Sequence, residues 1–150
     1  MLLGSGVLVA VFVGIIRTVP ALYTVAIGLG ALLWLIGNGL WLAGWSIPQV
    51  VLWWAGFLVM TIAGERLELS RMLRLSATAS RLFVAATALF GAGLLVSLAD
   101  YPSGVRLTGL GMLALAGQLA RYDIAWRRLK AGGQARFVAV CLLSGYVWLA

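Results

Sequence analysis

Long apolar runs alternate with short polar links along almost the whole chain. A helix needs about 20 apolar residues to cross roughly 30 Å of hydrocarbon, and six runs approach or reach that length. These runs are residues 2–16, 21–43, 48–63, 82–99, 107–120 and 137–150. Because backbone polar groups in lipid must find partners within their own segment, each run is predicted to be an α-helix. The pattern therefore predicts an all-α transmembrane bundle of about six helices, forming one transmembrane domain over residues 1–150.

The composition supports a membrane location. Hydrophobic residues make up 63% of the 150 residues and charged residues only 10%, against about half and a quarter in a soluble domain. So few polar side chains cannot cover the surface of a soluble fold of this size. The lipid bilayer is therefore expected to be the main partner of the chain.

The net charge of +7 is explained by topology rather than by nucleic acid, so no nucleic-acid partner is expected. Basic residues collect in the cytoplasmic links of multi-pass proteins. Here the links 17–20, 64–81 and 121–136 hold every Lys and Arg except Arg106. These are alternate links, which predicts that they are cytoplasmic and that both chain ends are periplasmic. The expected location is the bacterial inner membrane.

The link 64–81 also contains the carboxylates Glu65 and Glu68. Apolar or small residues recur after them at positions i, i+3, i+4 and i+7, namely Leu69, Met72, Leu73 and Ser76. This spacing predicts a short amphipathic helix on the membrane surface. A second interpretation makes Glu65 a proton or cation ligand at the membrane boundary.

Two polar side chains fall within apolar runs, Asn38 in the second and Gln118 near the inner end of the fifth. Such residues are usually hydrogen-bonded to a neighbouring helix. The alternative places one or both along a transport path. The candidates for a polar site or transport path are therefore Asn38, Glu65 and Gln118.

Small residues four apart are typical of close helix contacts. Four such pairs are predicted to lie on packing faces: Gly39 and Ala43, Ala88 and Ala92, Gly93 and Ser97, and Ala116 and Ala120. Tryptophans 41, 45, 53 and 54 bracket the outer turn at 44–48. They are predicted to form an aromatic belt at headgroup level, with ligand stacking as the alternative.

The residue types that carry most enzyme chemistry are scarce. The chain has no histidine and one cysteine, Cys141, which lies in an apolar run. Zinc, copper and heme sites draw chiefly on His, Cys and Met, and Ser–His pairing needs a histidine. We therefore expect no catalytic residue, no metal site and no cofactor within this chain, which is not predicted to be an enzyme.

Two stretches, GFLVMTIAGERLELSR (56–71) and ARYDIAWRR…ARFVAVCLLSGYVWLA (120–150), resemble a family of uncharacterised bacterial polytopic inner-membrane proteins. That family is distantly similar to the heme- and copper-binding membrane proteins of the nitric-oxide response. Its members continue into further helices that carry histidines. The resemblance implies that this chain is a histidine-free fragment, truncated at its C-terminus. Because those histidines have no counterpart here, no site residue is carried over.

The sequence leaves three functions open. The leading interpretation is a multi-pass membrane protein that forms a non-catalytic part of a larger polytopic protein, linked through the resemblance to heme, copper or small-gas handling. The alternative is a small permease or transporter subunit that acts as an oligomer. A third is an assembly subunit, which would pack against copies of itself or against other membrane subunits.

Overall fold

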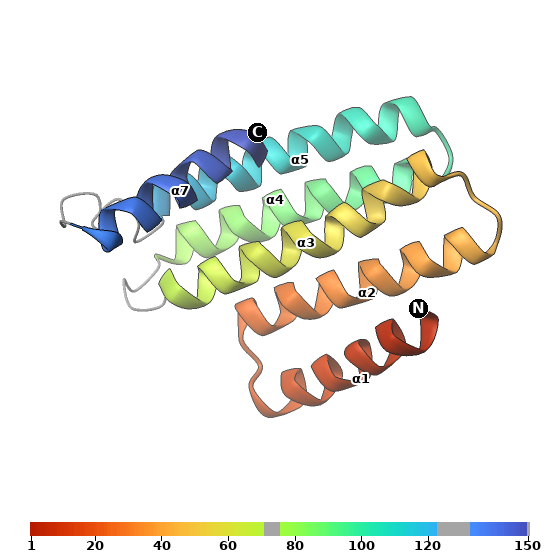
Figure 1. Cartoon of the computed structure of the whole chain (residues 1–150), viewed down its shortest axis with the longest axis horizontal. Coiled ribbons are helices and arrows are strands. Elements are labelled where there is room, and N and C mark those ends of the chain that lie inside the picture. Colours follow the sequence, from red (N-terminus) through yellow and green to blue (C-terminus); the bar gives the residue numbers. More distant parts are fainter. Residues whose placement is uncertain (71–75, 123–132, 150) are drawn as a thin grey trace. The chain divides into compact units, whose positions relative to one another are not determined.

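In a computed structural model of the chain, which describes residues 1–70, 76–122 and 133–149, all regular structure is helical (Figure 1). The helices are α1 (Leu2–Thr18), α2 (Leu22–Leu42), α3 (Ile47–Ser70), α4 (Ala77–Val96), α5 (Tyr101–Tyr122) and α7 (Gln134–Leu149). Each predicted apolar run falls largely within one of these helices. The all-α prediction is confirmed.

Among the residues that the structure describes, three helices are long and apolar enough to cross a membrane. They are Leu22–Leu42, Ile47–Leu69 and Ala77–Val96, corresponding to α2, most of α3, and α4. Leu2–Thr18 and Gln134–Val147 are shorter apolar helices, and α5 is less apolar than the others. These features are those of a membrane protein.

The third helix is longer than its apolar run. We predicted a span over 48–63, but α3 continues to Ser70, so Glu65, Arg66 and Glu68 lie on the helix and not in a link. The helix outlasts the apolar run because hydropathy falls at Gly64 while helix propensity does not, and the bounds of the span stay a prediction. Glu, Arg and Leu are all good helix formers.

The fourth and fifth helices also begin earlier than predicted. Helix α4 starts at Ala77, where the Ser76 hydroxyl caps the helix by accepting a 3.2 Å hydrogen bond from the Ala79 N–H. Helix α5 starts at Tyr101, with Pro102 in its first turn, where proline is tolerated. Arg106 therefore lies on α5 and not in a link.

Part of the predicted amphipathic surface helix falls outside the described residues, which exclude 71–75. Leu69 lies on α3, and Ser76 is the cap of α4. Most of the basic link 121–136 likewise falls in 123–132, which the structure does not describe.

The chain divides into two compact units, residues 1–68 and 69–150. The first contains α1, α2 and nearly all of α3, and the second contains α4, α5 and α7. The single transmembrane domain over 1–150 stays a prediction.

In the first unit, α2 packs against both α1 and α3 (Figure 1). A Cβ added at Gly30 would lie 3.0 Å from the Phe57 carbonyl oxygen, and one added at Gly64 would lie 3.0 Å from the Tyr23 carbonyl oxygen. Glycine thus lets the α2 and α3 backbones approach closely near the middle of the pair and near one of its ends. The turn between these helices uses Gly44 at φ 88, a conformation that other residues rarely adopt.

In the second unit, α4 and α5 pack as a close antiparallel pair (Figure 1). Buried positions on α5 recur at intervals of three and four residues: Gly104, Thr108, Gly111, Leu115, Ala116 and Leu119. A Cβ added at Gly93 would lie 2.3 Å from the Thr108 nitrogen, and one added at Gly111 would lie 2.5 Å from the Phe90 Cα. Helix α7 packs on α5, and its buried residues Ala139 and Tyr146 lie seven apart on one face.

The predicted packing pairs have mixed outcomes. Gly93 and Ser97 are confirmed, because both are buried where α4 meets Thr108 and Gly104 of α5. At Gly39, a Cβ would meet nothing within 4 Å in the described part of the chain, so its predicted packing is not seen within the first unit. Ala88 and Ala92 are exposed on α4, so their predicted packing is not seen within the second unit and stays a prediction for contacts with other subunits.

Many large apolar side chains remain exposed. They occur on all six described helices, for example Val7, Leu32, Leu58, Leu95, Leu110 and Val147. Exposed apolar side chains distributed in this way would be unfavourable in water but suit a lipid environment.

Candidate functional site

Three helices of the first unit are joined by a buried polar network centred on Asn38. The Asn38 Nδ2 donates a 3.1 Å hydrogen bond to the Ser5 Oγ on α1, and the Trp54 Nε1 on α3 donates a 3.2 Å bond to the Asn38 Oδ1. Asn38 is 1% exposed and Ser5 0%. We call Ser5, Asn38 and Trp54 the polar clasp.

The polar clasp gives each of its members a partner. The Asn38 amide uses its oxygen and its nitrogen on two different helices. The Ser5 hydroxyl accepts from Asn38 and can donate to the Leu2 carbonyl oxygen, 3.1 Å away on its own helix. Hydrogen bonds between membrane helices contribute about 0.6 kcal/mol each on average, and up to about 1.7. The clasp therefore stabilises contact among α1, α2 and α3.

Some of the tryptophans around the turn between α2 and α3 pack against other residues of the unit, whereas the predicted belt would require side chains at the surface. Trp53 is buried, and the Trp54 N–H is engaged by Asn38. The Trp54 ring also meets Trp41 edge-on, with ring centroids 6.4 Å apart. Trp41 itself is 45% exposed, as the belt prediction expects of it.

Glu65 lies apart from the clasp. Its side chain is exposed on α3, 11 residues beyond Trp54, which corresponds to about 17 Å along the helix axis. The structure therefore does not bring Asn38 and Glu65 into one site. From the start of α3 at Ile47 to Glu65 is about 27 Å at the same rise per residue, close to the thickness of the hydrocarbon.

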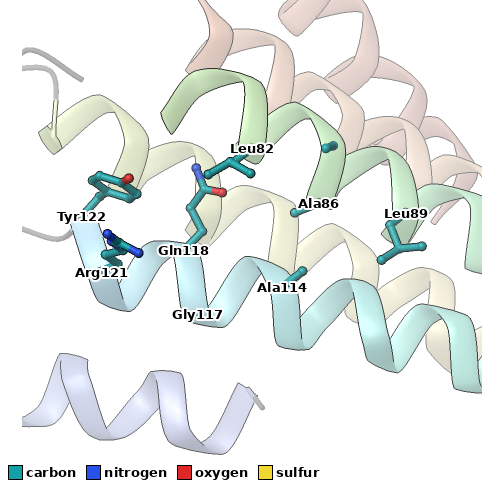
Figure 2. Close-up of a pocket in the computed structure, with 9 residues that line it drawn as sticks. Leu82, Ala86, Leu89, Ala114, Gly117, Gln118, Arg121 and Tyr122 are labelled. Atoms are coloured by element: carbon teal, nitrogen blue, oxygen red, sulfur yellow. The ribbon is translucent and has the colours of Figure 1, made fainter. Parts of the chain in front are cut away.

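Gln118, in the second unit, lines a groove between α4 and α5 with a volume of about 400 Å³. Figure 2 shows the groove, which is lined by Leu82, Ala85, Ala86, Leu89, Ala114, Gly117, Gln118, Arg121 and Tyr122. We call this the α4–α5 groove.

The polar side chains of the α4–α5 groove gather at one end. Gln118, Arg121 and Tyr122 lie there, whereas Leu89 and Ala114 lie toward the other end (Figure 2). The Gln118 Nε2 donates to the Ala79 carbonyl oxygen in the first turn of α4. The Arg121 guanidinium carbon lies 5.8 Å from the centre of the Tyr122 ring, within the range of a cation–π contact.

The structure also identifies residues that the sequence analysis did not select. Ser5 is the only hydroxyl-bearing residue in its apolar run, which was a usable signal. Trp54 was assigned to the belt, and nothing in the sequence distinguished it from Trp53. Arg121 was counted as a topology residue, and its place beside an apolar groove depends on the pairing of α4 with α5.

The donor set of this chain does not fit a heme or copper site. The sequence has no histidine, and Cys141 is exposed on α7. Within residues 1–70, 76–122 and 133–149, no three His, Cys, Asp or Glu side chains are close enough to hold a metal ion. We derive no chemistry through either group.

Comparison with known proteins finds a match to one family over the whole chain. Neither the curated proteins nor the solved structures contain a match. The matching family is described as a domain of unknown function, and the match covers residues 1–150. The chain therefore belongs to the family "Domain of unknown function (DUF8744)".

Proposed function

We propose that this chain is a non-catalytic, membrane-embedded helical module of a multi-pass protein in a bacterial inner membrane. Its role is to hold helices in a fixed arrangement, within a larger assembly, and not to conduct a substrate. The observation that carries this proposal is the polar clasp. The most buried polar amide of the first unit, Asn38, has both its nitrogen and its oxygen hydrogen-bonded to other helices and so joins three helices.

The topology of the proposal follows from charge within each unit. In the first unit, Arg17 lies at the end of α1 and Arg66 near the end of α3. In the second unit, Arg81 lies near the start of α4 and Arg121 near the end of α5, whereas Arg106 lies near the start of α5. The positive-inside rule then favours cytoplasmic placement of the more basic ends. With six crossings, both chain ends would be periplasmic.

The competing function is a small permease in which Asn38 lines a path. A residue on a transport path needs hydrogen-bonding capacity to offer its substrate. The Asn38 oxygen and nitrogen are instead bonded to Trp54 and Ser5. The geometry favours the structural role.

A link to heme, copper or a small gas belongs to the proposed assembly and not to this chain. Because the chain has no histidine, ligands for such a group would come from partner subunits. Heme or copper that copurifies with a membrane complex containing this chain, and not with the chain alone, would support the link.

The substitution Asn38→Leu tests the proposal. It removes two interhelical hydrogen bonds and leaves the partly buried Trp54 N–H without its partner, so we expect stability to fall by about 1–3 kcal/mol. Stability is measured by unfolding the detergent-solubilised protein with sodium dodecyl sulfate. Hydrogen exchange should quicken in α1 and in the first turns of α3.

The matched control is Gln49→Leu, which also replaces a polar amide by leucine. The Gln49 Oε1 accepts hydrogen bonds from the neighbouring Ser46, from the hydroxyl at 2.7 Å and from the N–H at 3.3 Å. Because these bonds are local and exposed and join no second helix, we expect a smaller loss of stability than for Asn38→Leu. If Asn38→Leu leaves stability unchanged but abolishes a substrate flux into proteoliposomes, the result would support the permease function and contradict the structural role.

A further inference from the structure

The α4–α5 groove is a continuous apolar track between two helices. Its α4 side is formed by Leu82, Ala85, Ala86 and Leu89, and its α5 side includes Ala114, Gly117, Gln118 and Arg121. Both sets follow i, i+3, i+4 and i+7, so each lies on one face of its helix. Small residues form much of the lining, and they leave space beside the two leucines.

One end of the track is cationic and polar. Arg121 and Tyr122 lie in the last turn of α5, and Gln118 lies one turn earlier. The opposite end, at Leu89 and Ala114, is apolar (Figure 2). From Ala114 to Arg121 the track extends about 10 Å along the helix. A ligand that fits both ends has a negatively charged head and an apolar tail.

We propose that the α4–α5 groove binds an anionic phospholipid, with its phosphate at Arg121 and one acyl chain along Gly117 and Ala114. The inference rests on the membrane location and topology proposed above, which place the end of α5 at the cytoplasmic headgroup level. Basic pockets between membrane helices on that side commonly hold anionic lipid headgroups. The volume of about 400 Å³ lies within the range of small-ligand sites.

Charge complementarity selects the anionic lipid over a zwitterionic one. Arg121 is exposed, and its guanidinium can give a phosphate two parallel hydrogen bonds. Tyr122 adds a phenol at headgroup level, where tyrosine is favoured. A net negative headgroup gains this attraction without an ammonium group opposing it.

The test uses the full chain, purified in a nonionic detergent and titrated with phosphatidylglycerol or phosphatidylcholine. Native mass spectrometry counts the lipids bound per chain. We expect phosphatidylglycerol to bind more tightly, and Arg121→Gln to weaken it about fivefold, the effect of one basic residue near an anionic headgroup. Arg106→Gln is the charge-matched control, because it removes the same charge near the opposite end of α5, and it should change little.

A second pair of variants tests the acyl-chain track. Gly117 is exposed, and a Cβ there would meet nothing within 4 Å, so Gly117→Leu should fill the groove without disturbing the fold. We expect it to weaken phosphatidylglycerol binding at least as much as Arg121→Gln. Gly109→Leu adds the same side chain to the same helix, also in open space but outside the groove lining, and should bind lipid as the parent chain does.

Equal binding of the two lipids, or equal effects of Arg121→Gln and Arg106→Gln, would overturn the inference. So would a shift from dimer to monomer in Gly117→Leu with unchanged lipid binding, because the groove would then hold a second copy of the chain. If the chain still requires detergent for solubility, these results would contradict lipid binding in the groove and leave the proposed membrane function standing. A chain that is soluble without detergent would instead overturn the proposed membrane function.

Discussion

Replacing Gly111 by alanine tests how closely α4 and α5 approach. The new Cβ would lie 2.5 Å from the Phe90 Cα and 2.6 Å from the Phe90 nitrogen. Both are backbone atoms, so no change of rotamer relieves the overlap. Ordinary contact begins at 3.4 Å, and the two backbones must therefore separate by about 0.9 Å in the direction of that contact.

The size of the stability loss depends on how many α4–α5 contacts this separation weakens. Gly93 and Gly104 make equally close approaches on the same interface, so widening it at Gly111 loosens those contacts as well. A gap of about 0.5–1 Å forfeits a quarter to a half of the dispersion energy of each contact. Overpacking of this kind costs about 1–3 kcal/mol, against which alanine gains up to about 1 kcal/mol of helix propensity.

The matched control is Gly109→Ala, two residues earlier on α5. A Cβ at Gly109 meets nothing within 4 Å, so this variant gains the propensity without the overlap. We expect Gly111→Ala to be less stable than Gly109→Ala by about 1–3 kcal/mol. The assay is sodium dodecyl sulfate unfolding in mixed micelles followed by circular dichroism, with hydrogen exchange of α4 and α5 peptides as the local measurement.

Equal stability of the two variants, within about 0.5 kcal/mol, would contradict the predicted overlap between Gly111 and Phe90. It would mean that the α4–α5 contact yields without cost, or that the helices do not meet at Gly111. A loss of stability with no change in α4 and α5 exchange would also count against it, because the overlap would then act elsewhere.

Two further predictions concern a buried hydroxyl and the topology. The Thr108 Oγ1 is buried and has no hydrogen-bond partner among the described residues, so Thr108→Val should leave stability unchanged or raise it by about 1 kcal/mol in the same unfolding assay. A clear loss would reveal a partner for the hydroxyl. With Cys141 replaced by alanine, single cysteines at Ser46 and Ser103 should react with an impermeant maleimide in spheroplasts, and cysteines at Ser76 and Gln134 only after lysis. Labelling of Ser76 and Gln134 from opposite sides would contradict the proposed threading.

The apolar runs predicted the existence of each helix but not its ends. Hydropathy marks where the chain leaves an apolar environment, and a helix can continue past that point. Glu65 to Glu68 extend α3 because their helix propensity is high. Asp100 and Pro102 mark the start of α5 better than hydropathy does, since Asp100 precedes the first turn and its carbonyl oxygen accepts from the Gly104 N–H.

The partners of the polar side chains could not be predicted from the sequence. Asn38 and Gln118 were expected to bond to other helices, and both do. Ser5, however, lies 33 residues from Asn38. Hydropathy does not show how α1 and α2 are rotated about their axes so that these two side chains meet. In a membrane helix the buried and the lipid-facing sides are both apolar, so the hydrophobic pattern does not show which side faces the neighbour.

The hydrophobic pattern likewise did not show which glycines, or which residues of the α4–α5 groove, face the neighbouring helix. Gly109 and Gly111 are two residues apart in a similar sequence context, yet only Gly111 meets α4. The spacing of Leu82, Ala85, Ala86 and Leu89 could be read as one helix face. The sequence does not show that Arg121 lies at the end of that face, because its position depends on the register in which α4 and α5 pack.

The unbroken course of α3 has a mechanical consequence. One continuous helix joins Trp54, which is held by Asn38, to the carboxylates Glu65 and Glu68. A helix transmits rotation about its axis as a stiff rod does, with no loop between the two ends to absorb it. A rotation of α3 about its axis would therefore move the Trp54 indole relative to Asn38 and turn Glu65 and Glu68 by a similar angle, about 17 and 21 Å farther along the helix.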